Sequence, residues 1–216
     1  MKICMEPGNL AIRVRAALAW GCALLVLGSV TGCATGPENV HVHLAPYASQ
    51  PARHEGMAPT AGLVRIDRVR DARHDEVGGL VGDRTGLGGM SMGKIEVLPE
   101  PTAMVATLLQ AELTAMGLKV VESDEQFRVD ARLLQFRIST PATALYWDIN
   151  GVIELELDVQ TAGGTGHMAR YTANCTERTY AWPSEEIIGR VVSACLKEGG
   201  RQLRGDARLS EFLSAR

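Results

Sequence analysis

Alternation of apolar and polar residues is the strongest structural signal in this chain. The clearest case is residues 153–160, with apolar Ile153, Leu155, Leu157 and Val159 between polar Glu154, Glu156, Asp158 and Gln160. A period of two places one row against a core and leaves the acidic row solvated. Carboxylates spread along a strand do not converge as a calcium loop does, so we expect no calcium site there. After glycines at 163–166, residues 168–182 predict a further long strand.

A change of phase predicts a β-bulge. The apolar positions are Phe127, Val129, Ala131 and Leu133, and then, in the opposite phase, Leu134, Phe136 and Ile138. A slip of one residue would turn every side chain to the other face, so we expect a bulge near Leu133 and Leu134. Shorter β-type runs at 63–67, 94–98 and 118–121 predict further strands.

Two longer segments have helical periodicity. Residues 102–116 carry apolar side chains at helical spacing, with Thr102 as a candidate N-cap and Gly117 where a left-handed C′ residue belongs. A second helix begins after Ser184, a candidate N-cap followed by two glutamates, and Gly199 and Gly200 are its candidate break points. Asp206 is the candidate cap of a short last helix over 207–213.

These elements predict an α+β domain over residues 61–216. We expect an antiparallel or mixed sheet of five to six strands, with two main helices packed on one face and a short C-terminal helix. The second face of the sheet would be open. That open face and the glycine-rich hairpin at 78–93 are the expected contact surfaces.

The N-terminal 32 residues predict a secretory signal peptide. Arg13 and Arg15 precede an apolar run of about 15 residues, too short to span a bilayer, and small residues follow. The run ends in Val-Thr-Gly-Cys at residues 30–33, which resembles the bacterial lipobox. The resemblance implies cleavage before Cys33, lipidation of that cysteine, and anchoring by several acyl chains. Met5 is an alternative start.

Residues 33–60 predict a tether between the lipidated cysteine and the domain. They contain four prolines among scattered polar residues, and a flexible chain of this length spans roughly 30 Å root-mean-square. Within it, residues 40–44 alternate and predict a short strand. His41 and His43 share one face of that strand, but without a third ligand nearby we expect two solvated histidines. Ala34 after the cysteine resembles an outer-membrane sorting signal.

Charge excludes some partners. The formal net charge is −3 for the whole chain and about −5 after residue 32. A mildly acidic protein is a poor electrostatic partner for nucleic acid, so no nucleic-acid binding is expected.

Two cysteines remain in the predicted domain. Cys175 and Cys195 are a candidate disulfide in an oxidising periplasm, and closing a loop of this size would stabilise the fold by roughly 3 kcal/mol. The alternative is two buried free thiols.

No cofactor is predicted. Residues 88–94 match the start of a phosphate-binding loop, but Ile95 replaces the magnesium-binding hydroxyl and Lys94 enters a strand, not a helix. No metal site and no catalytic residue is expected. A periplasmic hydrolase using His74, Asp71 or Asp75 with Ser91, Ser139 or Ser184 is the least favoured reading, because no nucleophile elbow or zinc motif accompanies them.

Four residues form the candidate contact surface. Asp71 and Arg73 follow the first strand in an Asp-x-Arg-x-Asp pattern, while Tyr146 and Trp147 place two large aromatic rings near a loop. The alternative for the aromatic pair is packing back onto the core.

The chain resembles the YajG-type family of bacterial lipoproteins. The resemblance rests on the order of elements, on the helix segment 108–117, on the strand 127–136 and on the ending 210–216. It implies an outer-membrane lipoprotein facing the periplasm, with no active-site residues. The strand and helix order also resembles other envelope lipoproteins, including activators of cell-wall synthases and auxiliary subunits of lipid transport.

These features favour a non-enzymatic binding or scaffold role in the cell envelope. The expected partners are the membrane, through the lipid anchor, and an envelope protein or peptidoglycan. The alternative is a carrier of lipid or another small ligand between sheet and helices, although strands with one polar face argue against a closed apolar barrel.

Overall fold

The computed structural model describes residues 38–49, 62–74 and 76–214. They belong to one compact unit that begins at Pro37. Its strands are β1 (Val40–His43), β2 (Gly62–Asp71), β3 (Leu80–Thr85), β4 (Ser91–Leu98), β5 (Leu118–Val120), β6 (Phe127–Ser139), β7 (Trp147–Thr161) and β8 (Gly166–Thr179). Its helices are η1 (Leu87–Gly89), a 3₁₀ turn, and α2 (Pro101–Ala115), α3 (Glu185–Gly205) and α4 (Ala207–Ser214).

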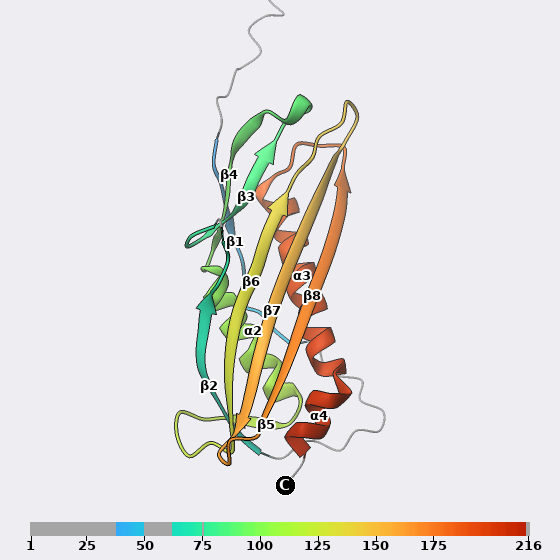
Figure 1. The fold of residues 1–216 in the computed structure, drawn as a ribbon. Helices are drawn as coiled ribbons and strands as arrows, with labels where there is room; N and C mark the ends of the chain where they lie inside the picture. Colours follow the sequence, from blue (N-terminus) through green and yellow to red (C-terminus); the bar gives the residue numbers. More distant parts are fainter. Residues whose placement is uncertain (1–37, 50–61, 75, 215–216) are drawn as a thin grey trace, which may run out of the picture. The chain divides into compact units, whose positions relative to one another are not determined.

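A long antiparallel meander of β6, β7 and β8 forms one side of the sheet, with β8 at the edge (Figure 1). The other edge of β6 is shared by two parallel strands, first β2 and then β3. Beyond β3 lie β4 and β1, while β5 pairs with β2. The result is an open mixed sheet, which confirms the α+β class.

The predicted count of five to six strands is wrong, because the sheet has eight strands. The short strand predicted at residues 40–44 is confirmed as β1, but it pairs into the sheet and was not counted in the predicted domain. The strand that was not predicted is β3, which is short and lies in the glycine-rich stretch, where no alternation identifies it.

Burial along the central strands follows the predicted alternation. The apolar row of β7 is buried, and its acidic row lies on the other face. The bulge in β6 is confirmed, since the pairing with β7 shifts between Leu133 and Gln135. Leu133 and Phe136, on either side of the shift, are both fully buried.

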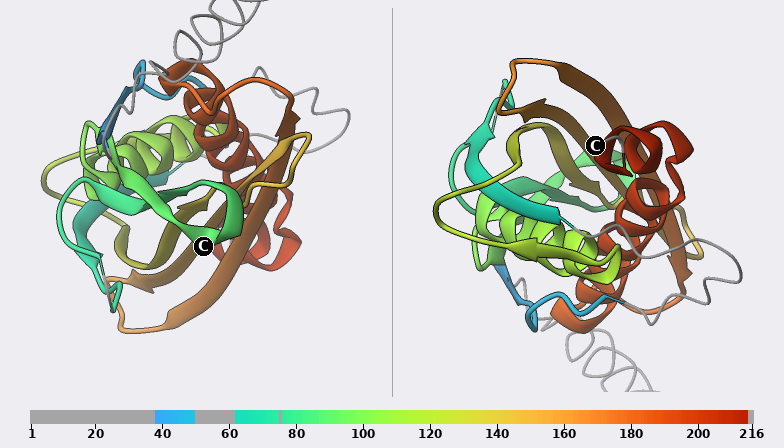
Figure 2. Two further views of the ribbon diagram at one scale, coloured as in Figure 1. Left: turned by 90° about the horizontal axis from the view of Figure 1, so that it is seen from above. Right: turned by 90° about the horizontal axis from the view of Figure 1, so that it is seen from below.

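Helices α2 and α3 cover the inner face of the sheet, which curves around them (Figure 2). Helix α2 begins at Pro101 and Thr102 is not its cap, because proline is preorganised for the first helical position. Gly117 ends this helix with φ +93°, as expected. The Oγ of Ser184 accepts a hydrogen bond from the Ile187 amide, which confirms the cap of α3.

Helix α3 runs through Gly199 and Gly200 without a break. Gly200 is required for packing, because an added Cβ would overlap Tyr47 and Glu112. The fully buried Glu112 carboxylate accepts a hydrogen bond from the Tyr47 hydroxyl and pairs with Arg204 Nε at 2.5 Å. This network joins residue 47, α2 and α3. Burial, and then the hydrogen bond to Glu112, raise the pKa of the Tyr47 hydroxyl.

Part of the predicted tether belongs to the domain. In β1, Val42 is fully buried and Val40 nearly so, and the strand pairs in parallel with β4. The amide of Leu44 continues this pairing by donating to the Leu98 carbonyl. The sheet therefore holds the chain from Glu38 onward, only five residues after Cys33.

Candidate binding surfaces

The predicted signal peptide, Cys33, Ala34, residues 50–60 of the predicted tether and Asp75 lie outside the described residues. Lipidation at Cys33 therefore stays a prediction.

Arg73 is a structural clamp. Its side chain is only 2% exposed. The guanidinium donates to both carboxylate oxygens of Asp71, at 2.9 and 2.7 Å, and to the carbonyls of Gly78 and Leu80, each at 2.8 Å. These bonds close the loop between β2 and β3, so Arg73 is occupied inside the domain. The hydrogen bond from Arg73 holds the pKa of the Asp71 carboxyl below its usual value.

A charged trough of about 480 Å³ lies beside this clamp. His74 and Ser139, two members of the hydrolase hypothesis, both line it, together with Glu76, Lys94 and Arg137. Within the described part of the chain, no hydrogen bond joins His74 to a serine. Ser184 caps α3 instead. The trough thus brings together polar groups of both signs without a nucleophile paired to a base.

The open face of the sheet is polar and internally paired. Arg132 of β6 bonds Glu156 of β7 at 2.7 Å, and Arg170 of β8 reaches Glu154 and Glu156, both at 3.3 Å. Glu154 and Glu156 of the acidic row of β7 are therefore paired with arginines on the neighbouring strands, whereas Asp158 accepts a hydrogen bond from Gln160.

Tyr146 and Trp147 lie in an aromatic cluster at one end of the sheet. Trp147 meets the edge of Trp182 at 5.6 Å between centroids, and Tyr146 meets Tyr180 at 6.2 Å. Sequence reasoning missed Tyr180 and Trp182 because it assigned them to a strand, whereas β8 ends at Thr179. The available signal was Pro183, directly after these residues, since proline cannot donate a hydrogen bond within a strand interior.

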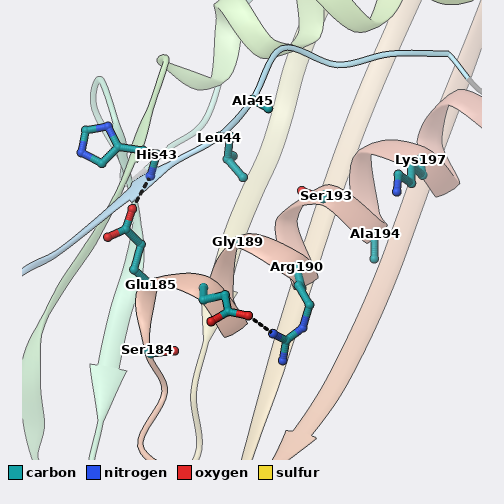
Figure 3. Close-up of a pocket in the computed structure, with 11 residues that line it drawn as sticks. His43, Leu44, Ala45, Ser184, Glu185, Gly189, Arg190, Ser193, Ala194 and Lys197 are labelled. Carbon is teal, nitrogen blue, oxygen red and sulfur yellow. Dashed lines mark hydrogen bonds and ion pairs between the residues drawn. The ribbon is translucent and has the colours of Figure 1, made fainter.

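A larger open groove runs between α3 and the chain segment after β1 (Figure 3). Its volume is about 910 Å³. Gly189 of α3 packs against this segment, since a Cβ added there would lie 3.4 Å from Val42 and 3.7 Å from Leu44. The amide of His43 donates to Glu185 Oε1 at 3.0 Å and fixes one end.

Charges of both signs line this groove. Glu186 pairs with Arg190 at 3.1 Å, while the exposed Lys197 makes no ion pair among the described residues. Between Arg190 and Lys197 along α3, the groove is lined by the small side chains of Ser193 and the exposed Ala194. An open surface of this kind suits an extended polar chain more than an enclosed small ligand.

Cys175 and Cys195 are neighbours. Both are free thiols in this structure, and a hydrogen bond joins the two side chains. Burial raises the pKa of both thiols, which makes them poor nucleophiles. Their adjacency brings β8 and α3 together at this point, and the disulfide remains a prediction.

Neither a membrane span nor a metal cluster occurs in the described ranges. None of the helices there is long and apolar enough to cross a bilayer. No group of three metal-ligating side chains gathers in the same ranges, and His41 pairs with Glu96 at 3.2 Å.

Comparison with known families decides the identity. Residues 68–214 match the model of a family described as "Uncharacterized lipoprotein". The chain belongs to this family. The match confirms the resemblance to YajG-type lipoproteins, and it covers the clamp, the trough, the aromatic cluster and all of α3.

Similar chains are found among solved structures, and the first of them shares the fold of this lipoprotein. A Xanthomonas campestris protein of family DUF330 is 8% identical, with a TM-score of 0.55, over 80% of this chain and 97% of its own. A minor lipoprotein from Acinetobacter baumannii is 15% identical, with a TM-score of 0.39, over 53% of this chain and 88% of its own. No curated protein matches the sequence.

Proposed function

We propose that this lipoprotein is anchored to the outer membrane through acyl chains on Cys33, faces the periplasm, and acts as a non-enzymatic binding component of the cell envelope. Family membership and the lipobox-like residues 30–33 support the anchor. Ala34 supports the outer-membrane address.

The groove along α3 carries the binding role. It is the larger of the two surface hollows described above. Its walls present Glu185, Glu186, Arg190 and Lys197, and Lys197 makes no ion pair with any described residue. A periplasmic protein segment or a peptidoglycan strand with alternating polar groups would meet complementary charges along its length.

The absence of a paired nucleophile and base in the trough supports a non-enzymatic role. Among the described residues, no side chain is hydrogen-bonded to His74 to orient it as a catalytic base, and the carboxylate of Asp71 is already held by Arg73.

A carrier of lipid is less well supported. The apolar cavity between the helices and β7–β8, lined by Leu108, Leu155 and Tyr171, holds only about 20 Å³. That volume has room for about one water molecule, so an acyl chain would require the core to open.

Crosslinking in cells tests this function. The lipidated protein is the bait, and a Cys33→Ala exported form is the control for the anchor. Ala194→Trp fills the groove at an exposed position, and Ala103→Trp is the matched control on α2, also exposed. We expect an envelope partner that is lost with Cys33→Ala and Ala194→Trp and kept with Ala103→Trp. An empty pull-down with bound lipid in the mass spectrum would favour the carrier instead.

A further inference from the structure

Large exposed apolar side chains gather at one end of the sheet. Eight such residues are exposed in the described ranges, and five of them lie in three loops at this end: Leu87, Met90, Leu145, Tyr180 and Trp182. The loops are β3–β4, β6–β7 and β8–α3, at the upper end in Figure 1. We name these five residues the apolar tip. Leu145, Tyr180 and Met90 are 76%, 75% and 65% exposed, so this surface is not part of the core.

The three loops of the apolar tip are held together. Thr85 donates its amide to the Thr140 hydroxyl at 2.9 Å and its own hydroxyl to the Thr140 carbonyl at 2.8 Å. Trp182 packs between Trp147, at 5.6 Å, and the guanidinium of Arg84, at 4.7 Å from the ring centroid. The loops of the apolar tip are therefore held in place by hydrogen bonds and by aromatic packing beneath the exposed side chains.

The chain enters the domain at the same end. The guanidinium of Arg84, which covers Trp182, also donates to the carbonyl of Glu38 at 2.8 Å. The Glu38 amide donates to the Met92 carbonyl at 3.1 Å. Gly93 allows this contact, since a Cβ there would overlap the Glu38 carbonyl. The first residue that the structure describes is thus fixed beside the apolar tip.

Only five residue steps separate Glu38 from Cys33. Fully extended, they span at most about 18 Å. An interfacial segment lies within roughly 5–10 Å of the boundary between headgroups and acyl chains. With acyl chains on Cys33, a domain held at Glu38 cannot move far from the bilayer, and the apolar tip is the part of it nearest the anchor.

We infer that the apolar tip docks into the interface of the bilayer that holds the acyl chains of Cys33. This inference rests on the proposed lipid anchor. Tryptophan and tyrosine favour the membrane interface because an apolar ring meets the hydrocarbon while its polar edge stays hydrated. Leucine and methionine add purely apolar area to the same surface.

Docking would depend on apolar contact more than on charge. Arg84, beside Trp182, is buried and donates to the carbonyls of Glu38 and Met92. Farther out, Arg178 bonds Asp148 at 2.7 Å, and Lys94 bonds Asp83 at 2.7 Å. Among the described residues near the tip, little exposed and unpaired positive charge therefore remains to attract anionic lipid. The strands of the meander, each at least 13 residues long, would then carry the far end of the domain roughly 40 Å or more into the periplasm.

The two tryptophans of the predicted mature chain, Trp147 and Trp182, both lie at this end and report directly on docking. The lipidated protein is reconstituted into phosphatidylethanolamine–phosphatidylglycerol vesicles with acyl chains brominated near the headgroup. We expect these lipids to quench the tryptophan emission, with little change when salt is raised. Trp147→Phe leaves Trp182 as a single reporter and should retain the quenching.

Matched methionines provide the control. Met90 in the tip and Met168, at the start of β8, are 65% and 66% exposed. Met90→Ser combined with Leu145→Ser should reduce the quenching, and Met168→Ser should not. The inference would be overturned if the mass confirms acylation and the tryptophan emission is quenched by aqueous iodide but not by brominated lipid. Protein that lacks acyl chains by mass would instead overturn the proposed anchor.

Discussion

The buried carboxylate of Glu112 provides the sharpest test of how the fold is held together. Its replacement, Glu112→Gln, keeps nearly the same volume beside Gly200 and can still accept the hydrogen bond from Tyr47. It removes the negative charge that faces Arg204 at 2.5 Å. Glu112 is fully buried and the Arg204 side chain is 12% exposed.

The expected cost follows from that burial. Breaking one partner of a buried ion pair destabilises a protein by about 3–5 kcal/mol. Arg204 retains some contact with solvent, so we expect the lower end, about 3 kcal/mol. For a domain of this size, each 1 kcal/mol lowers the melting temperature by roughly 2–4 °C, so the predicted fall is about 6–12 °C.

Urea unfolding of the mature protein, followed by tryptophan fluorescence, measures this free energy. Glu186→Gln on α3, where the side chain is 83% exposed, is the matched control and should change stability by less than about 0.5 kcal/mol. The double variant Glu112→Gln, Arg204→Met should cost less than the sum of the two single changes. A cost below about 1 kcal/mol for Glu112→Gln, or strict additivity in the double variant, would refute the reasoning.

Three further predictions follow from single contacts. Gly93→Ala should destabilise the domain by about 1–3 kcal/mol in urea unfolding, because Gly93 has φ +123° and an added Cβ would overlap the Glu38 carbonyl. An unchanged urea concentration at the unfolding midpoint would contradict this contact. Asp71 has a lowered pKa in the folded state, so the stability that its carboxylate contributes is complete above about pH 4 and is lost as the pH falls below that value. Asp71→Asn should therefore weaken the fall of the unfolding free energy with decreasing pH, and the same pH dependence in both proteins would count against the clamp. Mild oxidation should join Cys175 to Cys195, detected as two blocked thiols by mass, and should raise the unfolding free energy by about 3 kcal/mol, whereas two alkylated cysteines after oxidation would exclude the bond.

Local pattern was sufficient to predict much of the fold. The alternation in β7, the phase change in β6 and the cap at Ser184 each depend on neighbouring residues, and the structure confirms all three. Long-range pairing was not predictable in the same way. Strand β1 owes its place to β4, more than 50 residues later, and its four residues carry too little periodicity to predict the pairing.

The candidate surfaces were harder to predict for the same reason. Arg73 looks exposed in sequence, because nothing there shows that two carbonyls and a carboxylate surround it. Tyr146 and Trp147 were identified, but their partners Tyr180 and Trp182 come from a loop more than 30 residues away. The groove lies between residues 43–45 and helix α3, two segments about 140 residues apart in the sequence.

Site-specific photocrosslinking from the groove tests the binding role most directly. A photoreactive amino acid is placed at Ala194 in the lipidated protein, and at Ala103 as the control, and both strains are irradiated as intact cells. The account predicts a discrete adduct from position 194, identified by mass spectrometry as an envelope component, and none from position 103. The same adducts from both positions, or none from position 194, would contradict it.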